Sequence, residues 1–260
     1  MSTTPILLIG AGRMGGALLD GWRKAGAFEA SDVHVIDPHP GEAAKRARAW
    51  GVRFDSDPGS AATVVLAVKP QLWREAAAEI EPRLAREAVI VSIAAGVRTA
   101  DLAKAFGGRR VARVMPTTAV AVGQGTASIF AAADEARARA HTLFDRVATT
   151  VDLDDEALMD AATAVSGSGP AYLYAYVEAL EAAGVAAGLS AVQAARLARS
   201  TVQGAAVLMA ESGTDPAELR RQVTSPGGTT AAALEVLLPA LEPLLRDAVA
   251  AAVKRSQELG

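Results

Sequence analysis

A glycine-rich segment near the N-terminus constrains the fold of this chain more than any other feature. Residues 5–10 are a short apolar run, and Gly10, Gly12 and Gly15 follow with the spacing GxGxxG. A helical pattern of apolar residues begins directly afterwards, which predicts a strand, a tight turn and a helix. The first glycine allows the turn, the second lets the backbone approach a pyrophosphate, and the third permits close helix packing. The pattern predicts dinucleotide binding at the helix N-terminus, with an ordinary glycine turn as the alternative.

Strand and helix patterns alternate through the first 153 residues. The predicted strands cover residues 5–10, 33–36, 52–54, 63–68, 89–93, 110–114 and 125–131. Besides the helix after the glycines, the predicted helices cover residues 41–49, 71–85, 99–106 and 134–147. This alternation predicts an α/β fold with a doubly wound, parallel (Rossmann) sheet.

The second part of the chain has a different pattern. We find no strand between residues 156 and 258 and expect helices over residues 155–166, 169–188, 190–212, 215–222, 228–236 and 238–258. Pro170, Pro216 and Pro239 lie near expected helix starts, where a missing N–H costs nothing. The predicted domains are a dinucleotide-binding domain at residues 1–153 and a helical domain at residues 154–260. The alanine-rich helices permit close approach, which favours burial against a second subunit.

The composition limits the chemistry that this chain can perform. It has no cysteine and only three histidines, which excludes thiolate chemistry and makes a histidine-based acid–base site hard to build. We therefore predict no metal site and expect the chemistry to come from a bound cofactor. The formal net charge of −3 offers no basic field for nucleic acid. No apolar stretch is typical of a membrane span and no export signal is recognised, so a cytoplasmic location is expected.

Asp37 closes the second predicted strand, 22 positions after Gly15. A carboxylate there can bind the adenosine ribose hydroxyls and would repel a 2′-phosphate, which favours NADH over NADPH. The alternative is that Asp37 is only a turn residue before Pro38. The ends of later strands should line the nicotinamide end of the cofactor, with residues Ala67, Val68, Lys69 and Pro70, then Ala94, Ala95 and Gly96, and then residues 115–117.

Two segments of the helical part interrupt helices with glycine, serine and proline. They read SGSGPAY at residues 166–172 and SPGGTT at residues 225–230. Turns of this composition at helix starts present free N–H groups and hydroxyls, which can bind a carboxylate. Plain helix connections are the alternative for each.

Taken together, these motifs resemble the pyrroline-5-carboxylate reductase family over essentially the whole chain. The resemblance rests on GAGRMG (10–15), AVKP (67–70), SIAAG (92–96), RVMPTT (113–118), SGSGPAY (166–172) and SPGGTT (225–230). It implies an oxidoreductase that uses NADPH or NADH to reduce the C=N bond of 1-pyrroline-5-carboxylate to L-proline, the last step of proline biosynthesis. It also implies homodimers, built in some members into larger rings, whose intertwined helical domains bind the small imino-acid substrate.

The resemblance also assigns roles residue by residue. The cofactor diphosphate would bind along the glycine loop, at Ile9, Gly10, Ala11, Gly12, Arg13 and Met14, and the nicotinamide would lie beside Val68, Lys69 and Ala95. Ser225, Gly228 and Thr229 would hold the substrate carboxylate. Thr230, the expected catalytic residue, would reach the ring nitrogen, and Glu156 matches a position that touches the imino acid. A protonated imine is already a strong electrophile, so the protein would mainly position it and exclude water.

Three segments depart from the family pattern. Residues 115–119 read MPTTA where the family usually has MPNTP, which leaves another cyclic imine as an alternative substrate. Small hydroxyl or basic residues are usual at the position of Asp37, and the stretch between Gly51 and Val64 is shorter than usual.

Other classes of protein share parts of these patterns. The β-hydroxyacid dehydrogenases also combine a dinucleotide domain with helices, but they rely on a lysine in the helical domain, and no lysine occurs between Lys104 and Lys254. A methyltransferase could share the glycine loop, although a helical second part would be unusual there. A nucleotide-sensing scaffold protein is the alternative without catalysis.

Overall fold

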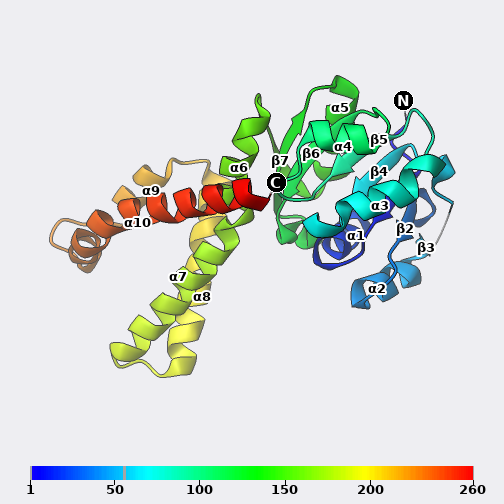
Figure 1. Cartoon of the computed structure of the whole chain (residues 1–260). Coiled ribbons are helices and arrows are strands. Elements are labelled where there is room, and N and C mark those ends of the chain that lie inside the picture. The colour runs from blue at the N-terminus through cyan, green and yellow to red at the C-terminus, as the bar shows by residue number, and fades with distance from the viewer. Residues whose placement is uncertain (1, 55–56, 260) are drawn as a thin grey trace. The chain divides into compact units, whose positions relative to one another are not determined.

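The computed structural model describes residues 2–54 and 57–259 (Figure 1). Contacts between residues divide the chain into two compact units. The sheet unit comprises the chain up to Gly167 together with the residues from Ala252 onward, and the helical unit comprises Ser168–Ala251. Residues 154–167 thus group with the sheet, whereas the sequence pattern predicts a domain boundary after residue 153. The domain assignment from the sequence stays a prediction.

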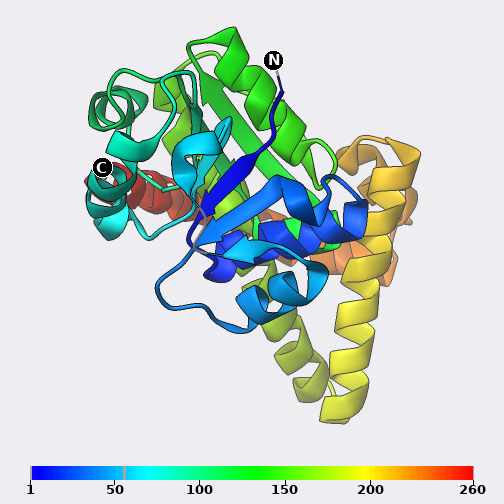
Figure 2. The ribbon, with the colours of Figure 1, turned by 90° about the vertical axis from the view of Figure 1, so that its right-hand side faces the viewer.

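The sheet unit has the predicted doubly wound α/β fold. Its strands are β1 (Ile6–Ile9), β2 (Val33–Ile36), β3 (Arg53–Phe54), β4 (Thr63–Leu66), β5 (Val89–Ser92), β6 (Val111–Pro116), β7 (Gly125–Ala131) and β8 (Ala148–Asp152). They form one sheet in the order β3-β2-β1-β4-β5-β6-β7-β8. Figure 2 shows the ribbon from a second side, with strands drawn as arrows. Strands β1 to β6 are parallel. The order reverses direction between β1 and β4, which is the switch point at which such sheets bind ligands.

Two features of the sheet differ from the sequence prediction. Strand β7 runs antiparallel to β6, because only a short 3-10 turn at Thr118–Val122 separates them, and a parallel crossover needs a longer connection. Strand β8 pairs parallel with β7 but was not predicted. Its sequence ATTVD is half polar and lies mostly exposed at the sheet edge, so it lacks the apolar run of the central strands.

Helices cover both faces of the sheet. Helices α1 (Arg13–Ala25), α2 (Glu42–Trp50) and α5 (Asp134–Phe144) contribute to one buried apolar cluster, and α3 (Trp73–Ile80) and α4 (Thr99–Ala105) to another. Trp22 is fully buried in the first cluster, and its indole N–H donates to the carbonyl of Leu143 at 2.8 Å. The central strands are buried on both faces, which explains their continuous apolar runs.

The segment between the sheet and the helical unit is irregular. Where one helix was predicted over residues 155–166, the structure has a 3-10 turn at Glu156–Leu158, helix α6 at Met159–Ala162 and a π-helical turn at Thr163–Gly167. The hydroxyls of Thr163 and Ser166 donate to carbonyls four residues earlier, at 2.7 and 2.8 Å. Such bonds loosen helical geometry, and π-turns are frequent at functional sites.

Four helices follow: α7 (Gly169–Ala186), α8 (Ala191–Ser212), α9 (Pro216–Gln222) and α10 (Thr229–Leu259). The predicted break between residues 236 and 238 is wrong, because α10 continues through Pro239 and Pro243. Each proline removes one backbone donor at a cost of about 3 kcal/mol, yet strong helix formers flank both and support one helix of 31 residues. No helix in the described ranges is long and apolar enough to cross a membrane.

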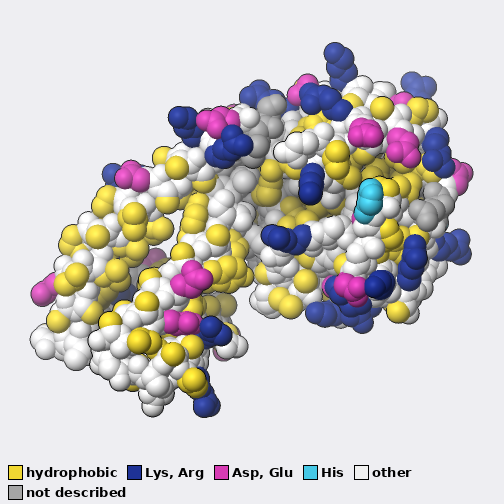
Figure 3. Space-filling view, turned by 60° about the horizontal axis from the view of Figure 1, so that its bottom comes forward, with side chains coloured by type: hydrophobic (Ala, Val, Ile, Leu, Met, Phe, Trp, Pro, Cys, Tyr) yellow, Lys and Arg dark blue, Asp and Glu magenta, His cyan; other side chains and the backbone are white. Residues whose placement is uncertain are grey.

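The helical unit, all of which the structure describes, has almost no core of its own. Only Ala194 and Ala198 are buried in it. Large apolar side chains such as Tyr174 and Val236 are 66% and 79% exposed. Figure 3 shows this apolar surface in yellow over the helices on the left.

Candidate functional site

The residues predicted to bind a dinucleotide lie along one edge of the sheet unit. Because β2, β1, β4 and β5 are parallel neighbours, the segments that follow them emerge side by side. Backbone bonds tie their bases together: Gly10 N–H donates to Ile36 at 2.8 Å, Ala67 N–H to Ile9 at 2.8 Å, and Ile93 N–H to Leu66 at 3.1 Å. The structure thus brings together the glycine loop and two of the predicted nicotinamide segments.

The three glycines of the loop serve different structural purposes. Gly10 has φ +94°, and a side chain there would meet the carbonyl oxygen of Ala67 at 2.9 Å. A side chain on Gly15 would overlap the carbonyl oxygen of Gly10. Around Gly12, in contrast, a Cβ atom would find nothing within 4 Å. Packing within the chain therefore explains Gly10 and Gly15, whereas the open side of Gly12 fits the close approach of a phosphate.

The residues before the helix are buried, and the first residues of the helix are more exposed. Ile9 and Ala11 are 4% and 2% exposed, so they anchor the loop in the core. Arg13 and Met14 begin α1, where Arg13 is exposed and Met14 half-buried. The free N–H groups of this first helical turn and the helix dipole favour an anion.

Asp37 braces the glycine loop. Its Oδ2 accepts the backbone N–H of Ala11 at 2.6 Å, and its Oδ1 accepts the N–H of His39 at 2.7 Å. The bond from His39 matches the turn role that was the alternative prediction for Asp37, whereas the bond from Ala11 joins Asp37 to the glycine loop. A carboxylate has about four acceptor positions, so ribose hydroxyls can still bind to it. The ribose contact and the preference for NADH stay predictions.

The strand-end segments differ in exposure. After β4, Ala67, Val68 and Pro70 are half-buried, and Lys69 is exposed. After β5, Ala94 is buried, and Ala95 and Gly96 are half-buried. Gly96 has φ +78°, a conformation that favours glycine, and it turns the chain toward α4. The nicotinamide contact expected of these residues stays a prediction.

The SPGGTT segment forms a type II turn at the start of α10. Gly228 N–H donates to the carbonyl of Ser225 at 3.0 Å, with Pro226 and Gly227 between them and φ +70° at Gly227. A Cβ atom on Gly228 would meet Ser225 Oγ at 2.5 Å, so a larger residue there would displace the Ser225 hydroxyl. The turn delivers Thr229 and Thr230 to the first positions of a helix of 31 residues. Free N–H groups at such a start suit a carboxylate.

Glu156 lies in the sheet unit, bonded on both oxygens. Its Oε1 accepts the N–H of Thr99 and a guanidinium N–H of Arg113, each at 2.7 Å, and its Oε2 accepts the Thr99 hydroxyl at 2.8 Å. Burial raises the pKa of Glu156, but the bonds from Arg113 and Thr99 lower it by more, so the net pKa lies below its ordinary value. Sequence reasoning found Glu156 but neither partner, because Arg113 and Thr99 are distant in sequence.

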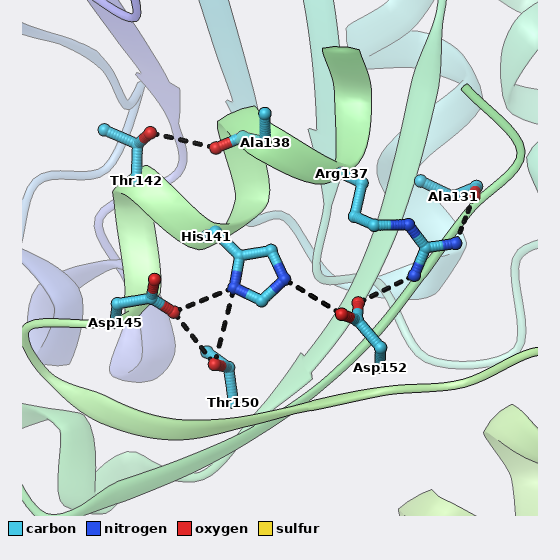
Figure 4. A network of polar contacts seen from close by, with 8 residues as sticks. All are labelled: Ala131, Arg137, Ala138, His141, Thr142, Asp145, Thr150 and Asp152. Carbon is cyan, nitrogen blue, oxygen red and sulfur yellow. Dashed lines mark hydrogen bonds and ion pairs between the residues drawn. The ribbon is translucent and has the colours of Figure 1, made fainter. Parts of the chain in front are cut away.

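A second polar cluster, which the sequence analysis missed, joins α5 to the edge strand β8 (Figure 4). The His141 ring lies between Asp145, 2.9 Å from Nδ1, and Asp152, 3.1 Å from Nε2, and Arg137 also binds Asp152 at 2.7 Å. Burial lowers the pKa of His141, but the two carboxylates raise it by more. Across the described ranges no group of three His, Asp or Glu side chains is placed to hold a metal ion.

Comparisons with known proteins cover both parts of the chain. The family model "Pyrroline-5-carboxylate reductase dimerisation" matches residues 156–259, and the model "NADP oxidoreductase coenzyme F420-dependent" matches residues 5–96. The pyrroline-5-carboxylate reductase of Pseudomonas aeruginosa is 41% identical over 268 positions, which cover 100% of this chain and 98% of that protein.

Solved structures agree. A pyrroline-5-carboxylate reductase from Coxiella burnetii superposes with a TM-score of 0.91 at 31% identity, covering 100% of this chain and 99% of that one. The Plasmodium falciparum pyrroline carboxylate reductase with NADP bound gives 0.85 at 26% identity, with coverage of 100% and 99%. The resemblance drawn from the motifs is confirmed: this chain belongs to the pyrroline-5-carboxylate reductase family.

Proposed function

We propose that this chain reduces the C=N bond of 1-pyrroline-5-carboxylate to give L-proline, with NADPH or NADH as the reductant. The observation that carries the proposal is that the segments after β1, β4 and β5 lie side by side, with free space around Gly12 for a phosphate. The chain also resembles these reductases over its full length. The same reaction completes proline biosynthesis.

The sheet unit would bind the cofactor. Gly10, Gly12 and the first turn of α1 would hold the diphosphate, because the loop leaves the side of Gly12 open and aims helix N–H groups outward. Val68, Lys69 and Ala95 would flank the nicotinamide. When bound, the cofactor supplies the hydride. The relative from Plasmodium falciparum was solved with NADP, so both NADPH and NADH are retained for this chain.

The SPGGTT turn would bind the substrate. Ser225, Gly228 and Thr229 would donate hydrogen bonds to the carboxylate, which the N-terminus of α10 would also attract. Thr230 would place its hydroxyl at the ring nitrogen. A threonine hydroxyl is too weak an acid to supply a proton alone, so its role is to orient an imine that arrives protonated. The chain has no histidine after His141, which agrees with a reaction that needs no histidine to donate the proton.

The helical unit would form a homodimer, with a larger ring of dimers as a further assembly. Its helices bury only two alanines and expose side chains such as Tyr174 and Val236, so they need a second surface to cover them. Exposed apolar side chains on α8 itself, such as Val207 and Leu208, add to this surface. The matched family model describes dimerisation over this region. The cytoplasmic location expected from the sequence stays a prediction.

A direct assay tests the activity. The purified chain should oxidise NADPH or NADH, seen as a fall in reduced-nicotinamide absorbance, only when 1-pyrroline-5-carboxylate is present. A panel of cyclic imines of other ring sizes, each with both cofactors, tests whether the altered residues 115–119 change the substrate. Absence of oxidation with both cofactors and every imine would refute a reductase and favour a nucleotide-binding scaffold.

A further inference from the structure

A buried ion pair lies beside the predicted nicotinamide segment. Arg113 and Glu156 meet at 2.7 Å, with only 7% and 23% of their side chains exposed. Thr99 adds its backbone N–H and its hydroxyl, so the carboxylate accepts three hydrogen bonds from two elements. Arg113 is buried and Glu156 half-buried, so removing the carboxylate would leave the Arg113 guanidinium without its charged partner.

Arg113 and Thr99, the two residues that Glu156 binds, lie on either side of the Ala94–Gly96 segment in the fold. Arg113 lies on β6 opposite Ser92, the last residue of β5. Alternation along the strands places both on the face of Ile90 and Val111, which belong to the apolar cluster of α3 and α4. Thr99 is the first residue of α4. The segment Ala94–Gly96 therefore lies between Ser92, which is opposite Arg113, and Thr99, and Glu156 binds both Arg113 and Thr99.

The bonding leaves Glu156 little freedom to act on a substrate. Three of its about four acceptor positions are already used, against two for Asp37, and its pKa is lowered, so the group is a held carboxylate at neutral pH. Arg113 Nε is buried without a partner within residues 2–54 and 57–259, which makes the bond to Glu156 the main compensation for this cation. The arrangement suits a brace between β6, α4 and the segment after β8.

We infer that Arg113, Glu156 and Thr99 form a clasp, a set of positioning residues that holds the Ala94–Gly96 segment in place for the nicotinamide. This inference rests on the proposed function. It departs from the role that the family resemblance implied for Glu156, which was contact with the imino acid. The clasp acts only on the nicotinamide end of the cofactor, whereas the glycine loop acts on the diphosphate.

The test compares two ligands by titration calorimetry: intact NADPH, with NADH in parallel, and ADP-ribose or its 2′-phosphate, which lack the nicotinamide. In Glu156→Gln, the affinity for the intact cofactor should fall about tenfold, which corresponds to about 1.4 kcal/mol. The kcat should fall as well, because hydride transfer depends on the placement of the nicotinamide. The affinity for the fragments should stay within about twofold of wild type, because the glycine loop is untouched.

The matched control is Glu81→Gln. Glu81 pairs with Arg109 at 2.7 Å, with 30% and 8% of the side chains exposed, so the pair resembles the clasp in length and burial. Arg109 precedes β6, however, and the pair lies at the opposite end of α4. Glu81→Gln should lower thermal stability to a similar extent while leaving both affinities unchanged.

Thr99→Val and Thr99→Ser keep the test decisive if Glu156→Gln does not fold. Thr99→Val removes the hydroxyl bond to Oε2 and should weaken intact cofactor only, whereas Thr99→Ser should restore wild-type affinity. Equal weakening of the intact cofactor and the fragments would overturn the inference. So would a rise confined to the KM of the imine, which would mean substrate contact. These titrations need no imine, so a chain that binds cofactor but reduces nothing would refute the proposed function and leave the clasp testable.

Discussion

Two glycines of one motif should respond in opposite ways to the same substitution. A Cβ atom at Gly12 finds nothing within 4 Å, and its backbone angles of −67° and −152° are extended rather than left-handed. A Cβ atom at Gly15 overlaps the Gly10 carbonyl, so the loop or α1 must shift. Gly12→Ala should therefore keep the fold and lose the cofactor, whereas Gly15→Ala should damage the fold.

The magnitudes follow from these surroundings. For Gly15→Ala, overpacking costs about 1–3 kcal/mol or more, of which about 1 kcal/mol is offset by the better helix propensity of alanine. At about 2–4 °C per kcal/mol in a chain of this size, the melting temperature should fall by several degrees. Gly12→Ala should change stability by less than about 1 kcal/mol. If its methyl group displaces one charge-assisted hydrogen bond to the diphosphate, the loss is about 1.5–3 kcal/mol, or about 10- to 150-fold in Kd.

Urea unfolding and titration of NADPH or NADH separate the two effects. Gly12→Ala should unfold at the wild-type urea concentration but bind the cofactor and its ADP-ribose fragments more weakly. Gly15→Ala should unfold earlier. Wild-type cofactor affinity in a folded Gly12→Ala variant would refute the reasoning, because it would mean that the open side of Gly12 does not face the diphosphate.

Three further predictions address single side chains. Asp37→Ser should shift the ratio of kcat/KM values for NADH and NADPH toward NADPH, and an unchanged ratio would leave Asp37 only its bond to the glycine loop. Thr230→Ala should lower kcat more than it weakens NADH binding, and full activity would remove its assigned role. Because the pKa of His141 is raised in the folded state, its stabilising effect should be complete below the unfolded pKa of about 6.5 and be lost as pH rises through the folded pKa. The difference in urea stability between wild type and His141→Gln should therefore shrink from about pH 5.5 to about pH 8.5, and a constant difference would contradict the two-carboxylate account.

Local patterns predicted those parts of the fold that local physics decides. The apolar runs of β1, β4 and β5 are buried on both faces, so their sequences carry a signal that needs no knowledge of neighbours. The tight turn at Gly10 and the close packing at Gly15 were likewise predicted from the local spacing of the glycines. Strand β8 was missed because it is held by pairing with β7 and by hydrogen bonds of its Asp152 and Thr150 to His141 and Asp145, and these contacts join β8 to other elements.

The candidate site shows the same limit. Asp37 was found at a strand end, but its bond to Ala11 spans 26 positions, and the bond from Arg113 to Glu156 spans 43. Pattern reasoning names residue types that suit a ligand, and it cannot tell whether another part of the chain already occupies their polar atoms. For Glu156 this distinction changes the inference from substrate contact to support of a loop.

The stability of the helical unit cannot come from its own interior, because so few of its side chains are buried. Fixing each backbone residue costs about 1–2 kcal/mol, and the burial of apolar surface must offset this cost. Two buried alanines supply little of that burial. Alanine-rich helices with exposed side chains such as Tyr174 and Val236 are suited to close packing against an equally apolar surface, which a second copy of the chain would provide. Because the alanine-rich helices bury so little by themselves, we expect the helical unit to fold together with its assembly into a dimer.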